Sequence, residues 1–322
     1  MNKLVNLSIL FFGTPEFALP ALGALIKNGY GIVGVITRPD ERVGRKQILT
    51  PPPVKILAEH HGIPVFQPER LDARDFAAGK IPRADLFIVA AYGKIIPKDI
   101  LEIPQYGALN IHPSLLPRWR GPSPIQYTIL NGDTETGVTI MKMDEKMDHG
   151  PIVSSIKYQV SSIKIIYREL HDELAKAGAK LLIETLPLYL DGKITPVPQD
   201  DAQATYSKIL TRDDGRIDWQ KSADGIERMI RAFTPWPGAW TLWPTGEKIL
   251  RVRIEKAEQI SAGGALQAGG PGFVRTEKNN PIVARTGDGF LAAQRIGVEG
   301  KKITDADSFL RGYPQVIGAS FI

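Results

Sequence analysis

Along the first 112 residues, short apolar runs alternate with segments of helical periodicity. The helical segments, 15–29 and 53–62, begin near a proline and end at a glycine. The apolar runs are continuous, which is typical of strands buried on both faces of a parallel sheet. The strands that this pattern predicts are 7–12, 31–37, 64–66, 85–92 and 107–112. We therefore expect an α/β domain with a mostly parallel sheet and helices on both faces.

The pattern continues to about residue 190 and then changes. Two further strands and a long helix are predicted at 136–143, 151–160 and 165–190. The stretch 191–206 is rich in proline and polar residues, which is typical of an interdomain linker. From 207 to 322, strand-like runs alternate with glycines, so a small β-barrel or sandwich is expected. The chain should thus hold two domains, at 1–190 and 207–322.

Composition excludes several kinds of chemistry. The chain has no cysteine, so disulfides, thiolate metal sites and cysteine nucleophiles are ruled out. The five histidines are not spaced as metal ligands, and no glycine-rich nucleotide motif is present, so neither a metal nor NAD or ATP is expected. No apolar run is long enough to span a bilayer, and the apolar start is interpreted as a buried strand rather than a signal peptide. These features fit a cytoplasmic protein.

The chain is basic, with a formal net charge of +5 and a pI near 9.2. Most of the excess lies in 207–322, which carries 17 Lys and Arg against 13 Asp and Glu. A basic C-terminal domain favours an anionic partner, with nucleic acid as the first candidate, although a solvated basic surface accounts for the charge equally well. Three tryptophans are expected in the core of this domain: Trp236, Trp240 and Trp243.

Polar side chains close the strand predicted at 107–112. Asn110 and His112 are two residues apart, so they lie on the same side of this strand. An amide and an imidazole at the carboxyl end of a strand can stabilise a developing oxyanion, but they can equally be two satisfied polar groups. A carboxylate would orient the imidazole. Asp148 and Asp144 both follow the next strand, and spacing does not choose between them.

Seven sequence blocks run in order along nearly the whole chain: FFGTPEFALPAL, VAAYGKIIP, LNIHPSLLPRWRG, ETGVTIMKMD, DHG, RIDW and AFTPWPGAW. Together they resemble the methionyl-tRNA formyltransferases. The block LNIHPSLLPRWRG with a downstream Asp is typical of 10-formyltetrahydrofolate-dependent formyltransferases. The blocks RIDW and AFTPWPGAW favour the formyltransferase that acts on tRNA. The resemblance implies a Rossmann-like N-terminal domain that binds folate and an OB-like C-terminal barrel that binds tRNA.

The resemblance also implies a site and a reaction. Asn110, His112 and Asp148 match the family's catalytic residues, and the folate-binding segment matches Ser114, Leu115, Leu116 and Pro117. In the implied reaction, the amine of Met-tRNA attacks the formyl carbon of 10-formyltetrahydrofolate. Asn110 and a protonated His112 stabilise the oxyanion, and Asp148 keeps His112 charged and accepts the proton of the amine. His149 replaces the usual Thr beside Asp148 and is expected to point to solvent.

The prolines in and around this segment should fix its loop, so that backbone groups bind the pterin while Leu115 and Leu116 form an apolar wall. Arg118 and Arg120 are candidates for the folate tail or for tRNA phosphates, and a plain surface role is as plausible for either one.

The segment 38–55 is long for a connection between a strand and a helix. The resemblance implies that it contacts the tRNA acceptor end, although VGRKQ has fewer glycines and cations than is common in the family. A surface loop is the alternative. The expected tRNA-binding residues are Arg38, Arg42, Arg45, Lys46 and Lys208. Further cations that could line the RNA-facing side of the barrel are Arg228, Arg231, Arg251, Arg253, Lys301 and Lys302.

Two alternative functions remain open at this point. One is formyl transfer to a small amine, such as a nucleotide sugar or glycinamide ribonucleotide, which the basic barrel and the segment 38–55 disfavour. The other is a non-catalytic RNA-binding module, which the intact set of Asn110, His112 and Asp148 disfavours. A monomer is expected.

Overall fold

The computed structural model describes residues 7–44, 46–160, 164–260, 269–277 and 279–322, and its chain divides into two compact units. The first unit comprises 1–124, 134–160 and 170–208, and the second comprises 125–133, 161–169 and 209–322. In the described parts, no helix is both long and apolar enough to cross a membrane.

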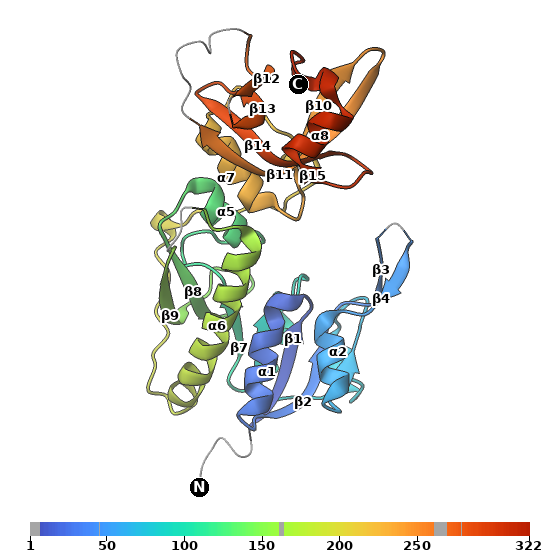
Figure 1. Ribbon diagram of the computed structural model, residues 1–322. Helices are drawn as coiled ribbons and strands as arrows, with labels where there is room; N and C mark the ends of the chain where they lie inside the picture. The colour runs from blue at the N-terminus through green and yellow to red at the C-terminus, as the bar shows by residue number, and fades with distance from the viewer. Residues whose placement is uncertain (1–6, 45, 161–163, 261–268, 278) are drawn as a thin grey trace. The chain divides into compact units, whose positions relative to one another are not determined.

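The first unit is built on a seven-stranded sheet in the order β5-β2-β1-β6-β7-β8-β9 (Figure 1). Strands β5, β2, β1, β6 and β7 pair in parallel, whereas β8 and β9 are antiparallel. The bounds are β1 Ser8–Gly13, β2 Gly31–Ile36, β5 Val65–Phe66, β6 Leu86–Ala90, β7 Ala108–His112, β8 Glu135–Lys142 and β9 Ile152–Gln159. The predicted Rossmann-like, mostly parallel sheet is therefore confirmed.

The three helices predicted before residue 191 are all found. The long predicted helix is α6 (Tyr167–Leu190), whose buried residues recur three or four positions apart. The segment 15–29 forms η2 Glu16–Ala18 and α1 Leu19–Lys27, and the segment 53–62 forms α2 Pro53–His60. Three helices were not predicted: α3 Ala73–Ala77, α4 Lys98–Leu101 and α5 Pro124–Asn131, of which α5 lies almost entirely in the second unit. Strands β1 and β6 are buried almost throughout, so they form the centre of the core. This burial explains why their sequences are continuously apolar.

Two segments of the first unit differ from the irregular connections expected of them. The segment 38–55 contains an antiparallel hairpin of β3 (Glu41–Val43) and β4 (Ile48–Thr50), followed by the first turn of α2. The stretch 191–206, predicted as a linker, lies in the first unit, where Val197 and Ile152 exchange backbone hydrogen bonds of 2.8 Å. A proline-rich composition disfavours regular structure, but it does not prevent a segment from pairing with a strand edge.

The second unit is an antiparallel sheet in the order β10-β11-β14-β13-β12, with β15 paired to β14 (Figure 1). The bounds are β10 Ala239–Thr245, β11 Lys248–Ile260, β12 Val274–Glu277, β13 Asn280–Arg285, β14 Phe290–Val298 and β15 Thr304–Asp305. Among the described residues, β10 and β12 do not pair, so the sheet does not close directly into a barrel. Instead, Ile322 exchanges backbone hydrogen bonds with Leu242 of β10, and Phe321 bonds to Gly272 just before β12. The last residues of the chain thus link the two ends of the sheet.

The second unit also holds two helices that were not predicted, α7 (Ala223–Phe233) and α8 (Ala306–Gly312). In α7, apolar residues recur at helical spacing on the buried side, and the Ser222 side chain caps the first turn. This signal was present in the sequence and was missed.

The prediction of three core tryptophans is correct for two of them. Trp240 and Trp243 are buried on β10, whereas Trp236 is 51% exposed. Trp236 lies between two prolines in the turn before β10, where no strand pairing directs its side chain inward.

The Asp85 carboxylate binds Ser8, the first residue of β1. These hydrogen bonds make the stability of the folded chain depend on pH. Asp85 accepts from the Ser8 backbone nitrogen at 2.9 Å and from Ser8 Oγ at 2.6 Å. These bonds, the hydroxyl first, hold the pKa of Asp85 below its ordinary value. A lowered folded-state pKa contributes stability above the unfolded-state pKa, and that stability is lost as the pH falls through the folded-state pKa.

We expect Ser8→Ala to lower the free energy of unfolding by about 1 kcal/mol near neutral pH, because a hydrogen bond to a charged group is lost. The difference from the unsubstituted chain should shrink as the pH falls below about 4, where the carboxyl becomes protonated. Urea unfolding at several pH values measures this difference. An effect that stays constant across the acid range would contradict the role of the Asp85 charge.

Candidate active site

Asn110 and His112 lie at the carboxyl end of β7, as their spacing predicted. Asn110 pairs with Val89 of β6 on one side and with Met141 of β8 on the other. Asn110 is 9% exposed and His112 is 4% exposed. Within the described chain, the Asn110 side chain has no hydrogen-bond partner. Its amide is therefore available to donate to a bound group.

The structure places Asp148, rather than Asp144, beside His112. His112 Nδ1 lies 3.6 Å from Asp148 Oδ1, and His112 Nε2 lies 3.0 Å from the carbonyl oxygen of Trp119. A carbonyl only accepts, so Nε2 carries the hydrogen and Nδ1 faces the carboxylate. Asp144 pairs instead with His149, whose Nδ1 lies 2.6 Å from the Asp144 carboxylate. The expectation that His149 points to solvent was therefore wrong.

The Asp148 carboxylate is oriented by the loop that follows the folate segment. The backbone nitrogen of Gly121 donates to Asp148 Oδ2 at 2.7 Å. Gly121 has a φ of +106°, and a Cβ on it would lie 2.5 Å from the carbonyl oxygen of Ser207. Only glycine fits there without displacing the amide that holds the carboxylate. Asp148 itself has a φ of +48°, a conformation that residues other than glycine adopt uncommonly.

The predicted folate segment, residues 114–117, is held by hydrogen bonds to Thr139 of β8. This support was not predicted from the sequence. Thr139 Oγ1 donates to the Ser114 carbonyl at 2.7 Å and accepts from the Leu116 nitrogen at 3.1 Å. These two backbone groups are therefore already engaged, and binding of the pterin by other backbone groups of the segment stays a prediction. Leu116 is buried, and Leu115 packs closely against Gly137. A threonine within an apolar strand was the only sequence signal of this support.

The Arg120 side chain is buried and does not lie at the surface. It is 2% exposed, and its guanidinium donates to Gln199 Oε1 at 3.0 Å and to Asp201 Oδ1 at 2.8 Å. The hydrogen bond from Arg120 holds the pKa of Asp201 below its ordinary value. This corrects the suggestion of a folate or phosphate contact for Arg120, whereas Arg118 is exposed.

The cations expected to contact RNA in the first unit differ in their surroundings. Arg38 forms an ion pair of 2.9 Å with Glu41, and Arg42 Nη1 donates to the Gln47 carbonyl at 3.1 Å within the hairpin. Lys46 is exposed at the hairpin turn, and Lys208 is exposed where the first unit ends. Arg45 lies outside the described residues.

Among the barrel cations, Arg231 and Arg228 are engaged inside the second unit. Arg231 is bound by Glu227 at 2.8 Å and donates to the Ile165 carbonyl, while Arg228 pairs with Asp224. These two arginines stabilise the unit and are poor candidates for an RNA-facing role. Lys301 and Lys302 are exposed.

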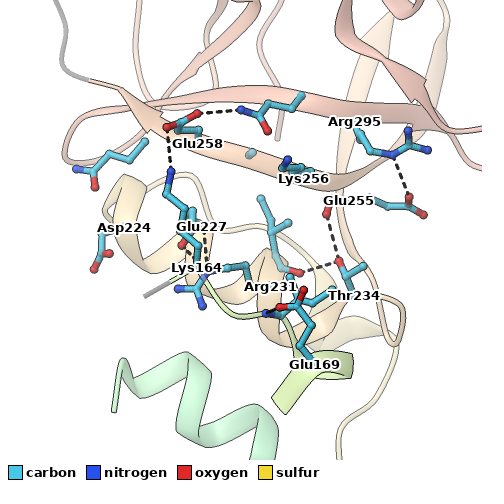
Figure 2. Close-up of a pocket in the computed structure, with 15 residues that line it drawn as sticks. Lys164, Glu169, Asp224, Glu227, Arg231, Thr234, Glu255, Lys256, Glu258 and Arg295 are labelled. Carbon is cyan, nitrogen blue, oxygen red and sulfur yellow. Dashed lines mark hydrogen bonds and ion pairs between the residues drawn. The ribbon is translucent and has the colours of Figure 1, made fainter. Parts of the chain in front are cut away.

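A pocket of about 710 Å³ lies in the second unit between α7, β11, β14 and the segment 164–169 (Figure 2). Its walls carry charges that pair with one another, such as Lys164 with Glu258 at 3.1 Å (Figure 2). None of the predicted catalytic or folate-binding residues lines it. Among the described residues, no three His, Cys, Asp or Glu side chains gather to hold a metal ion.

The packing around Gly121 yields a stability test with a matched control. Gly192 also has a positive φ, but a Cβ there would meet nothing within 4 Å. Gly192→Ala should lower the free energy of unfolding by about 1 kcal/mol, the cost of a positive φ for alanine. Gly121→Ala should lower it by at least about 3 kcal/mol, because its Cβ also meets the Ser207 carbonyl. Urea unfolding of both variants checks this difference, and equal losses would contradict it.

Two family models together match most of the chain. The formyl transferase model matches residues 5–186, and the model of the formyl transferase C-terminal domain matches residues 209–314. A methionyl-tRNA formyltransferase of Bacillus velezensis is 42% identical over 305 residues, which cover 94% of this chain and 94% of that protein. A methionyl-tRNA formyltransferase of Geobacter metallireducens is 40% identical over 310 residues, which cover 96% of each.

Solved structures share the fold at lower identity. The N-formyltransferase of Helicobacter canadensis, solved with folinic acid and dTDP-3-aminofucose, is 20% identical, with a TM-score of 0.63 over 88% of this chain and 98% of that chain. HypX of Aquifex aeolicus in complex with tetrahydrofolic acid is 16% identical, with a TM-score of 0.63 over 97% of this chain and 48% of that chain. These structures show a common fold. The higher identity to the curated relatives, over almost the whole length, shows that the chain belongs to the methionyl-tRNA formyltransferase family.

Proposed function

We propose that the chain transfers the formyl group of 10-formyltetrahydrofolate to the amino group of methionyl initiator tRNA, which gives N-formylmethionyl-tRNA for translation initiation. One observation carries the proposal for the site. The unengaged amide of Asn110 lies on the same strand as His112, whose ring faces the Asp148 carboxylate at 3.6 Å. This is an oxyanion-stabilising pair beside a proton acceptor, in a chain of the methionyl-tRNA formyltransferase family.

The reaction needs the methionyl amine as a free base. α-Amino groups titrate at about 7.7–8.0, so part of the population is neutral near pH 7 without further help. As the amine nitrogen bonds to the formyl carbon, negative charge develops on the formyl oxygen. The Asn110 NH₂ donates to that oxygen. No covalent bond to the protein is required.

His112 has a more constrained role than the sequence suggested. Both of its ring nitrogens face protein oxygens, those of Trp119 and Asp148. For His112 to donate to the formyl oxygen, the hydrogen on Nε2 must leave the Trp119 carbonyl and bond to the formyl oxygen instead. The Asp148 carboxylate remains beside Nδ1, on the other side of the ring. Asp148 then accepts the proton that the amine loses, and this proton is delivered to N10 as the bond between N10 and the formyl carbon breaks.

The folate and tRNA contacts belong to the same proposal. We assign the folate to the segment Ser114, Leu115, Leu116 and Pro117, whose backbone Thr139 holds in place. The N-terminal region, 1–190, carries catalysis, and the region 207–322 binds tRNA with the hairpin cations and Lys208. The excess of basic residues in the C-terminal region supports this division. The expected monomeric state and cytoplasmic location stay predictions, which light scattering and cell fractionation test.

Formyl transfer from 10-formyltetrahydrofolate to initiator Met-tRNA tests the proposal directly. We expect transfer by the unsubstituted chain and a loss of at least about 100-fold in kcat for His112→Ala and for Asp148→Asn, because each removes a group acting on the transition state. Asp148→Asn should retain tetrahydrofolate binding in calorimetry.

His60→Ala is the matched control, since His60 is exposed on α2, and it should keep full activity. Transfer to a small amine with none to Met-tRNA would overturn the choice of acceptor. Full activity of Asp148→Asn would overturn the assignment of the site.

The tRNA contact of the hairpin predicts a change in salt dependence. A cation that neutralises a phosphate releases counterions, so its loss lowers the slope of log K against log salt by about one. Arg42→Ala and Lys46→Ala should each show this change in filter binding of initiator tRNA. Lys193→Ala, which removes an exposed lysine paired with Asp191, should leave the slope unchanged. Identical slopes for all three variants would exclude the hairpin from phosphate contact.

A further inference from the structure

We propose that Gln199 is a positioning residue, which fixes the turn that carries Asp148 and thereby sets the place of the catalytic carboxylate. Gln199 comes from the segment 191–206, far along the chain from the strands that form the site. The inference rests on the proposed catalytic role of Asp148.

The turn between β8 and β9 needs an external support. Asp148 adopts a φ of +48°, which costs a residue with a side chain about 1 kcal/mol or more relative to ordinary backbone. Gly150 passes so close to β8 that a Cβ on it would lie 1.9 Å from the Lys142 carbonyl. Gln199 Nε2 donates to the carbonyls of Asp148 at 2.9 Å and of Gly150 at 2.8 Å. One amide group thus binds two carbonyls on the side of the turn that leads into β9.

The direction of the Gln199 amide is set by Arg120. Arg120 Nε donates to Gln199 Oε1 at 3.0 Å, and a guanidinium can only donate. The amide oxygen therefore faces Arg120, and both hydrogens of the NH₂ group point to the two carbonyls. Arg120 is fixed in turn by Asp201, which accepts at 2.8 Å. Gln199 is thus preorganised for a single orientation.

Arg120 also connects this support to the other side of the Asp148 carboxylate. The next residue, Gly121, donates its backbone nitrogen to Asp148 Oδ2 at 2.7 Å, and the preceding residue, Trp119, presents its carbonyl to His112 Nε2 at 3.0 Å. These contacts form a closed ring of hydrogen bonds. It runs from the Asp148 carbonyl to Gln199, then to Arg120, and through the backbone of Gly121 back to the Asp148 carboxylate. The backbone and the side chain of one catalytic residue are therefore held by one framework.

The backbone of Arg120 is also bound by residues close to Gln199 in the sequence. Arg120 N donates to the Thr205 carbonyl at 2.9 Å, and Ser207 N donates to the Arg120 carbonyl at 2.7 Å. Gln199 does not touch the reacting atoms in this arrangement. Its loss should let the turn relax and move the carboxylate relative to His112, and displacements of about 1 Å in a catalytic group can cost about 100-fold in rate.

Gln199→Glu is the most selective test. The side chain keeps its shape and still accepts from Arg120, but a carboxylate oxygen replaces the NH₂ group and faces two carbonyls that it cannot bond. We expect kcat for formyl transfer to fall about 10- to 100-fold, with KM for tRNA and for the folate changed by less than about threefold. Gln203→Glu is the matched control, because Gln203 lies in the same segment but its side chain bonds, among the described residues, only to Asp200, at 2.8 Å. It should retain the kcat of the unsubstituted chain.

A double-mutant cycle separates positioning from a merely structural role. If Gln199 acts through Asp148, Gln199→Glu should change the residual rate of Asp148→Asn by less than about twofold, whereas independent effects multiply. Rates are expressed per site titrated with labelled tetrahydrofolate, so that unfolded protein does not count. Gln199→Met, which removes the bonds without adding charge, should repeat the loss of kcat.

The outcomes distinguish this inference from the function on which it rests. No transfer by the unsubstituted chain would overturn the proposed function itself. Normal kcat of Gln199→Glu per titrated site, or the same fold-loss in both backgrounds of the cycle, would overturn the positioning role alone.

Discussion

The hydrogen bond from the Gly121 backbone nitrogen to the Asp148 carboxylate, 2.7 Å long, is the constraint on which the site depends. Gly121 lies in the connection after β7 and Asp148 in the turn after β8, so this bond joins two connecting segments that are distant in sequence. A charged acceptor makes it a strong bond. It leaves the other carboxylate oxygen, Oδ1, directed to His112. The chemistry therefore depends on a glycine that carries no functional group.

Most of the fold could be predicted because its signal is local. Continuous apolar runs gave every strand of the parallel region, since burial on both faces leaves no polar position. The hairpin within 38–55 was missed because its strands are short and exposed, and so carry no alternation. The polar composition of the segment 191–206 predicts a linker. Its attachment to the first unit depends on partners such as Ile152 that are distant in sequence.

The site was predictable only in part, for the same physical reason. Asn110 and His112 follow from the two-residue period of a strand. The choice of Asp148 over Asp144 needed the conformation of a turn, and in that turn the second carboxylate binds His149 instead. The supports supplied by Thr139 and Arg120 are side-chain bonds to backbone groups far away in the sequence. No pattern within a window of the chain predicts such bonds.

The amine that accepts the formyl group is not determined by the fold or by the catalytic residues. A sugar-nucleotide complex of an N-formyltransferase has the same fold at 20% identity. An amide, an imidazole and a carboxylate serve attack by any free amine equally well. What distinguishes a tRNA acceptor is its line of phosphates, which adds affinity through many separate cations. On the proposed assignment, specificity for tRNA comes from residues that take no part in the chemistry, such as Arg42 and Lys46 on the hairpin and the exposed cations of the C-terminal region. On that assignment, the catalytic residues and the acceptor-binding cations can change separately, so that the first keep the reaction and the second choose its substrate.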